Sequence, residues 1–199
     1  MSWNFTPISL LALGLAWPGA AAQAAASAPW LHPQVDYRAH TVMQSETGRL
    51  TGRVWASGPK ERRELVVKGH THTMIVRKDR GLVWVLLPEQ RLYLEQPLGE
   101  RGMTPDRFAD GQLAREALGS EVVNGAQATK YRVHGTAGDG EPFEALMWMT
   151  GQEIPVRIVT GAGSTRVEME LDELSLGAVD PSRFEIPSGY SRLDVGDVR

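Results

Sequence analysis

From Tyr37 onward the chain is divided into short segments of alternating polar and apolar residues, separated by turn-forming residues. Alternation with a period of two places successive side chains on opposite faces of an extended strand. Strands are predicted over residues 37–44, 48–57, 60–68, 71–78, 82–87, 90–95, 120–124, 127–135, 142–150, 154–160 and 164–175. Because the connections are short, consecutive strands must be antiparallel, with one apolar face and one face in water.

One stretch between two groups of strands departs from this pattern. Thr104 followed by Pro105 suits an N-cap and a first helical position, and apolar residues recur after them at near-helical spacing: Phe108, Leu113 and Leu118. One helix is therefore predicted within residues 97–120, with Gly119 as its C-cap. The predicted fold class is mainly β (α+β): an unclosed antiparallel β-barrel of about eleven strands, a central helix between strands six and seven, and a short C-terminal turn at residues 180–184.

Two dipeptides and three strands show the alternation of strands and turns most clearly. Asn124-Gly125 and Asp139-Gly140 are typical of tight hairpin turns. In the late strands one face collects apolar side chains while charges collect on the other, and an earlier strand repeats the division: Phe143, Ala145, Met147 and Met149; Val167, Met169 and Leu171; Met74 and Val76. These residues are the predicted apolar face of the sheet.

The N-terminal region predicts export. Residues 1–35 contain no Asp, Glu, Lys or Arg, and residues 8–17 form an apolar run that is too short to cross a bilayer as a helix. The alanine-rich stretch after it predicts cleavage by signal peptidase after Ala24 or Ala26. A disordered alanine-rich tail is the alternative, although Leu10-Leu11-Ala12-Leu13 is unusual for one. The predicted organisation is a signal peptide (1–24), an irregular lead-in (25–36) and one domain (37–199).

Cysteine usage and charge exclude several classes of protein. With no Cys, the chain has no disulfide, thiol nucleophile or zinc–thiolate site, and no N-terminal lipid attached through cysteine. It has 21 basic and 24 acidic residues, so the basic footprint of a general nucleic-acid-binding protein is missing. After the N-terminal run, no apolar stretch is long enough for a membrane-spanning helix. We therefore expect a protein of the periplasm or extracellular space, with peripheral rather than integral membrane contact.

Three segments resemble parts of LolA-like proteins, the periplasmic lipoprotein carriers and their relatives. Residues 76–88 have the form of a strand, an Asp-x-Gly turn at Asp79, a strand bearing Trp84 and a turn led by Pro88. Residues 52–63 are similar to the hairpin between the family's second and third strands, and residues 184–190 to a late segment. With the order of strands and helix, the resemblance covers most of residues 37–193.

The resemblance implies an unclosed antiparallel barrel whose apolar concave face holds acyl chains beneath a helical lid. It implies a periplasmic binding protein, not an enzyme, that shelters a lipid or the acyl chains of a lipoprotein, as in outer-membrane lipoprotein sorting. Candidate lining residues are Met74, Trp84, Met147, Met149 and Met169. Methionine adapts its shape to irregular guests, yet the same residues could equally fill a core. The alternative function is a cell-envelope sensor or scaffold that contacts a partner protein through the same half-barrel.

Other patterns give no assignable chemistry. His70 and His72 share a face of one predicted strand and His40 could lie nearby, but no further His or Cys completes a ligand set, so no metal site is predicted. Residues 161–165 are glycine-rich but lack the lysine of a phosphate-binding loop, and we expect a hairpin turn there. No G-x-S-x-G elbow is present, so no catalytic residue is assigned and a hydrolase is a third alternative. No cofactor is predicted.

Overall fold

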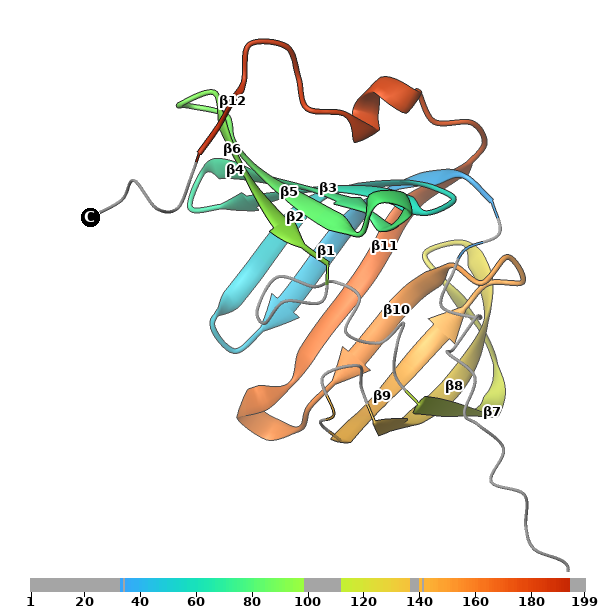
Figure 1. Ribbon diagram of the computed structural model, residues 1–199. Coiled ribbons are helices and arrows are strands. Elements are labelled where there is room, and N and C mark those ends of the chain that lie inside the picture. The colour runs from blue at the N-terminus through green and yellow to red at the C-terminus, as the bar shows by residue number, and fades with distance from the viewer. Residues whose placement is uncertain (1–32, 34, 99–111, 137–139, 141, 194–199) are drawn as a thin grey trace, which may run out of the picture.

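A computed structural model describes residues 33, 35–98, 112–136, 140 and 142–193 (Figure 1). Its strands are β1 (Tyr37–Ser45), β2 (Gly48–Ser57), β3 (Lys60–Val67), β4 (His70–Arg77), β5 (Leu82–Leu87), β6 (Leu92–Pro97), β7 (Gln112–Val123), β8 (Ala126–Thr136), β9 (Pro142–Met149), β10 (Pro155–Thr160), β11 (Val167–Leu176) and β12 (Ser191–Arg192). Short 3-10 turns are η2 (Lys78–Arg80), η3 (Gly163–Thr165) and η4 (Pro181–Phe184). The mainly β prediction is confirmed; β12 was not anticipated, and β7 begins at Gln112, well before the strand predicted at residues 120–124.

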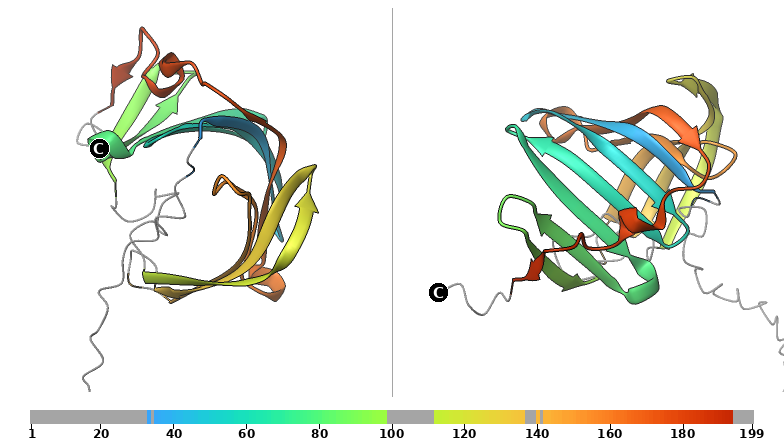
Figure 2. Two further views of the ribbon diagram at one scale, coloured as in Figure 1. Left: turned by 90° about the vertical axis from the view of Figure 1, so that its right-hand side faces the viewer. Right: turned by 90° about the horizontal axis from the view of Figure 1, so that it is seen from above.

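All twelve strands belong to one sheet, in the order β12-β6-β5-β4-β3-β2-β1-β11-β10-β9-β8-β7. The chain starts in the middle of this sheet, because β1 pairs with β2 on one side and with β11 on the other. Each half then extends outward through antiparallel hairpins, and among the described strands only the short pair of β12 and β6 is parallel. The sheet curves into an arch whose two edges do not pair (Figure 2). The predicted unclosed barrel is therefore confirmed.

The predicted central helix is the main correction to the fold. The described residues contain no α-helix. A helix long and apolar enough to cross a membrane is therefore also missing from them. The second half of the predicted helix is strand: Leu113 and Leu118 belong to β7, which pairs with β8 along its length. The proposed cap at Thr104-Pro105 and Phe108 lies outside the described residues. Strand pairing overrode a weak helical spacing, as tertiary context often does.

Two turn signals determine how β7 is built. Asn124 and Gly125 join β7 to β8 with φ values of 46° and 83°, the left-handed geometry that the sequence predicted for a tight hairpin. Gly119, predicted as a helix C-cap, instead lies at a bulge between Ala117 and Gly119 with φ of 133°. The second predicted hairpin signal is Asp139-Gly140. Asp139 lies outside the described residues, and Gly140 has a φ of 86°.

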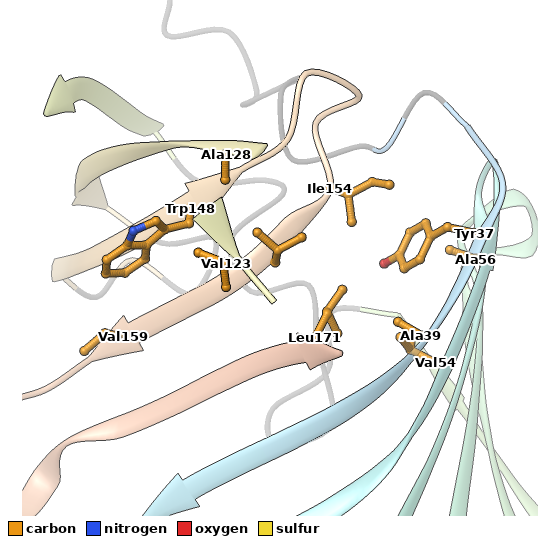
Figure 3. Packing of buried hydrophobic residues seen from close by; sticks show 11 residues of the cluster. Tyr37, Ala39, Val54, Ala56, Val123, Ala128, Trp148, Ile154, Val159 and Leu171 are labelled. Carbon is orange, nitrogen blue, oxygen red and sulfur yellow. The ribbon is translucent and has the colours of Figure 1, made fainter. Parts of the chain in front are cut away.

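The register places side chains on an inner and an outer face of the arch. Thr41 lies opposite Leu171, Met43 opposite Met169, and Met169 in turn opposite Ile158, so these residues share the inner face. Three clusters of buried side chains among the described residues hold the sheet together. The largest joins β1 and β2 to β7–β11 and includes Tyr37, Trp148, Ile154 and Leu171 (Figure 3). A second cluster, on the inner face, surrounds the fully buried Val133 and Met147.

The C-terminal segment covers the outer face of the first half of the sheet (Figure 2). Its turn η4 begins after Asp180, whose carboxylate accepts a hydrogen bond from the backbone N–H of Ser182 at 2.9 Å, with Pro181 in the first turn. This confirms the predicted C-terminal turn. Phe184, 1% exposed, then packs on the outer face against a group of buried side chains: Trp55, Ile75, Trp84 and Leu86. The C-terminal segment thus covers part of the outer face of this half, and the inner face is not covered by it.

Candidate functional site

A hollow of about 200 Å³ lies on the inner face, where the two halves of the sheet meet. It is lined mainly by side chains of β1, β10 and β11, with contributions from β2 and β3: Tyr37, Thr41, Met43, Val54, Arg63, Leu65, Pro155, Ile158, Thr160, Val167, Met169 and Leu171. Its floor is buried, because Tyr37 and Leu171 are each 4% exposed. Met43, Ile158 and Met169 are only partly buried, so apolar atoms remain accessible at its surface.

A few polar groups interrupt this apolar lining. Tyr37 points toward Ile154 and Leu171 (Figure 3). Burial raises the pKa of the Tyr37 phenol above its usual value of 10.0, and the nearby carboxylate of Glu61 raises the pKa further. The phenol is therefore a neutral hydrogen-bond donor at physiological pH. Thr41 and Thr160 add hydroxyl groups, and Arg63 forms an ion pair with Glu61. Sparse polar groups in an apolar hollow are typical of sites for apolar ligands.

The five predicted lining residues do not all lie together. Met169 lines the hollow. Met147 and Met149, at 0% and 2% exposure, are buried in the neighbouring inner cluster against Ile158, which itself lines the hollow. Met74 is half-buried and lies opposite Arg63 of β3. It therefore shares the inner face without being among the lining residues.

Trp84 lies on the outer face. It is opposite Ile75 of β4, whereas Met74 is opposite Val85, so Trp84 and Met74 occupy different faces of the sheet. Its indole N–H donates a hydrogen bond to Glu95 at 2.9 Å, and the guanidinium carbons of Arg77 and Arg80 lie 5.6 and 5.5 Å from its ring centroid. Trp84 therefore supports the cover formed by the C-terminal segment and takes no part in the hollow.

Sequence reasoning missed most of the first half of the lining. Tyr37, Thr41 and Met43 were not named as ligand contacts, although they lie at odd-numbered positions of β1, and polar Arg38 and His40 fall between Tyr37 and Thr41. That alternation was the available signal. Ile158 and Thr160 of β10 are also two residues apart, but Val159 between them is apolar and buried, so alternation gave no signal there. What the sequence could not supply was the pairing of β1 with β11, which brings these two sets together.

The histidines of β4 and the glycine-rich segment 161–165 do not line the inner hollow. His70 and His72 share one face of β4, as predicted, and His70 Nδ1 lies 2.7 Å from a carboxylate oxygen of Glu89. Within the part of the chain that the structure describes, no three His, Asp or Glu side chains gather as a metal site would require. Residues 161–165 form the turn between β10 and β11, where Gly161 has φ of 69° and η3 follows. The predicted hairpin is confirmed.

The curved sheet and its inner hollow define a class of protein in which one open, mainly antiparallel sheet surrounds an apolar interior. The resemblance to LolA-like proteins implied this arrangement. No protein-family model matches the chain, and no curated protein does. Solved structures do match. An uncharacterized conserved protein from Thermus thermophilus is 14% identical, with a TM-score of 0.56, and the alignment covers 80% of this chain and 90% of that one.

MucB is a second similar structure, at 15% identity, a TM-score of 0.51 and coverage of 79% of this chain. A MucA/MucB complex from Pseudomonas aeruginosa also matches, at 14% identity, a TM-score of 0.50 and coverage of 77% of this chain. This chain spans less than two thirds of MucB, 59% and 56% in the two alignments. A LolA superfamily protein from Nitrosomonas europaea is 10% identical, with coverage of 79% of this chain and 93% of that one and a TM-score of 0.46. At such identities the likeness is one of fold.

Proposed function

We propose that this chain is an exported binding protein that shelters one apolar chain, from a lipid or an acylated lipoprotein, in the hollow on its inner face. It catalyses no reaction. The observation that carries the proposal is the hollow itself, which leaves Met43, Ile158 and Met169 partly exposed between two packed clusters. Protein interiors are close-packed, so a lasting apolar gap of this kind favours a guest over a filled core. A role in sorting outer-membrane lipoproteins is one form of this function.

The size of the hollow limits the guest. At about 200 Å³ it is smaller than the roughly 300–1,000 Å³ of pockets that bury a drug-sized ligand. It therefore suits part of one acyl chain, with the headgroup outside. Each buried methylene contributes about 0.8 kcal/mol, which makes binding about fourfold tighter per added methylene until the hollow is full.

Titration with saturated fatty acids of increasing length tests this proposal, using displacement of a fluorescent fatty acid as the readout. We expect the dissociation constant to fall about fourfold per methylene and then to level off. Mass spectrometry of lipid extracted from the freshly purified protein is the companion measurement. A protein that carries no lipid and binds no fatty acid would exclude the proposed function.

A matched pair of substitutions locates the binding site. Val167→Trp places a large side chain in the hollow from the start of β11, where Val167 is half-buried. Val122→Trp makes the same change in β7 at a valine that is 65% exposed and does not line the hollow. We expect Val167→Trp to weaken fatty-acid binding at least tenfold, about the loss of two methylenes. Val122→Trp should bind as the parent does, and equal weakening in both variants would place the fatty acid elsewhere.

Export is the second part of the proposal. What supports it is the uncharged N-terminal region with its apolar run and alanine-rich stretch, together with the resemblance to periplasmic carriers. We expect residues 1–24 or 1–26 to be removed and the domain of residues 37–199 to act in the periplasm. The intact mass of protein recovered from a periplasmic fraction tests this. A mass equal to that of the full chain would contradict it.

The similarity to MucB favours a second candidate function, contact with a partner protein of the cell envelope. MucB has been crystallised in a complex with MucA, and it shares the fold of this chain over 78% of the present sequence at a TM-score of 0.50. Cross-linking in intact envelopes, followed by purification of the chain, distinguishes the two functions. A stable protein complex without bound lipid favours the scaffold, whereas bound lipid without a partner favours the carrier.

A further inference from the structure

A second and larger hollow, of about 410 Å³, lies on the outer face between the central strands and the C-terminal segment. Its wall combines the apolar side of Trp55 with three arginine side chains, Arg38, Arg53 and Arg183. Arg38 lies opposite Trp55 in the pairing of β1 with β2, and Arg53 lies opposite His40 in the same pairing. Arg183 comes from η4, so the hollow exists only because the C-terminal segment packs on the sheet.

The three guanidinium groups leave positive charge in this hollow. The guanidinium carbon of Arg183 lies 5.0 Å from the centroid of the Trp55 ring, which holds that side chain in place. Within the described residues, none of the three arginines forms an ion pair with a carboxylate. This is unusual on this sheet, where most other arginines pair with a neighbouring Glu or Asp, as Arg62, Arg77 and Arg157 do.

Two carboxylates also line the hollow, but in the described residues neither forms an ion pair with the three arginines. Glu173 lies 3.6 Å from Nδ1 of His40. Asp180 accepts the backbone N–H of Ser182 at 2.9 Å, and that hydrogen bond lowers the pKa of the Asp180 carboxyl, with a smaller contribution from the charge of Arg183. The cationic side chains therefore remain available to a ligand in solution.

We propose that this outer hollow binds a phosphate group, either free or as the headgroup of a lipid. Guanidinium groups present planar forks of N–H donors that match phosphate oxygens, and charge-assisted hydrogen bonds of this kind are the strong ones. A phosphate monoester carries up to two negative charges and several acceptor oxygens, so it can contact more than one arginine at once. The site lies on the face opposite the fatty-acid hollow and is independent of the function proposed above.

Calorimetric titration of the protein with inorganic phosphate, at constant ionic strength, tests the site. Arg53→Ala removes one guanidinium from the hollow. Arg49→Ala is the matched control, because Arg49 is also an exposed arginine of β2 without an ion pair in the described residues but lies outside the hollow. We expect saturable binding to the parent protein, about tenfold weaker binding to Arg53→Ala, and unchanged binding to Arg49→Ala. Unfolding midpoints of both variants establish that each is folded.

A second arm identifies the source of the phosphate. Sedimentation with phosphatidylcholine vesicles that contain phosphatidic acid, compared with phosphatidylcholine alone, tests a lipid headgroup. Binding that requires phosphatidic acid and is weakened by Arg53→Ala supports a lipid phosphate, whereas binding of inorganic phosphate alone supports a soluble phosphate monoester. Absence of binding in both arms, or equal loss in Arg49→Ala and Arg53→Ala, overturns the proposal.

Discussion

Arg77 is the side chain whose removal most directly tests how the C-terminal segment is held on the sheet. Its side chain is 4% exposed and donates two hydrogen bonds to Asp79, at 2.9 and 2.7 Å. It also donates to Glu185 at 2.7 Å and to the backbone carbonyl of Phe184 at 3.2 Å. One guanidinium thus joins β4, the η2 turn and the end of η4. Arg77→Met keeps an apolar stem and removes every one of these bonds.

The expected loss in the free energy of unfolding depends on how buried the carboxylates of Asp79 and Glu185 are once Arg77 is removed. Removing one partner of a buried ion pair costs about 3–5 kcal/mol. Asp79 and Glu185 are 29% and 48% exposed, so water can partly rehydrate them, and the lower end of that range applies. We therefore expect Arg77→Met to lower the free energy of unfolding by about 3 kcal/mol, or the thermal midpoint by roughly 10 °C.

Urea unfolding followed by tryptophan fluorescence measures this loss. Arg80→Met is the matched control: its guanidinium also stacks on Trp84, at 5.5 Å, but its side chain is 47% exposed and lies 3.7 Å from Glu185. An exposed pair of this kind contributes about 1 kcal/mol or less. If Arg77→Met loses no more stability than Arg80→Met, the buried guanidinium does not anchor the C-terminal segment and the reasoning fails.

Three further predictions concern pH and packing. The hydrogen bond from Arg77 lowers the pKa of the Asp79 carboxyl below its usual 3.8. The stability that this pair contributes is therefore complete above pH 3.8 and is lost as the pH falls through the lower pKa of the folded state. In acid unfolding, Arg77→Met should lack this pH dependence. Gly52→Ala would place a Cβ 2.0 Å from the backbone oxygen of Glu64, so we expect about 2 kcal/mol of destabilisation or more in urea unfolding. Met147→Ala, at a side chain with no exposure, should cost about 2–5 kcal/mol by the same assay, and a loss below 1 kcal/mol would mean that its cluster is loosely packed.

Local patterns were enough to predict most of the sheet. Alternation and turn residues placed eleven strands, because each hairpin depends on residues that are close in sequence: the Asn124-Gly125 turn predicts the pairing of β7 with β8 without any tertiary information. The helix prediction failed for the complementary reason. Leu113 and Leu118 have a spacing that a helix or a strand can accommodate, and the pairing partner in β8 decided between them.

The candidate site was harder to predict because it depends on contacts between distant strands. The run of residues 82–87 is apolar throughout, so alternation cannot assign a face to Trp84, and only its register with Ile75 places it on the outer side. Met169 alternates cleanly with charged residues and was placed correctly on the apolar face. Arg53 and Arg183 line the outer hollow together although they are far apart in the chain, and no local pattern indicates that they share it.

The central claim is that the inner hollow accepts an apolar chain, and methionine methyl groups report on this directly. Met43 and Met169 line the hollow from β1 and β11. In a protein labelled at the methionine methyls, with signals assigned by single substitutions, we predict that a soluble fatty acid shifts the Met43 and Met169 resonances in a saturable manner. Unchanged Met43 and Met169 signals at fatty-acid concentrations that saturate the fluorescence displacement would contradict the account.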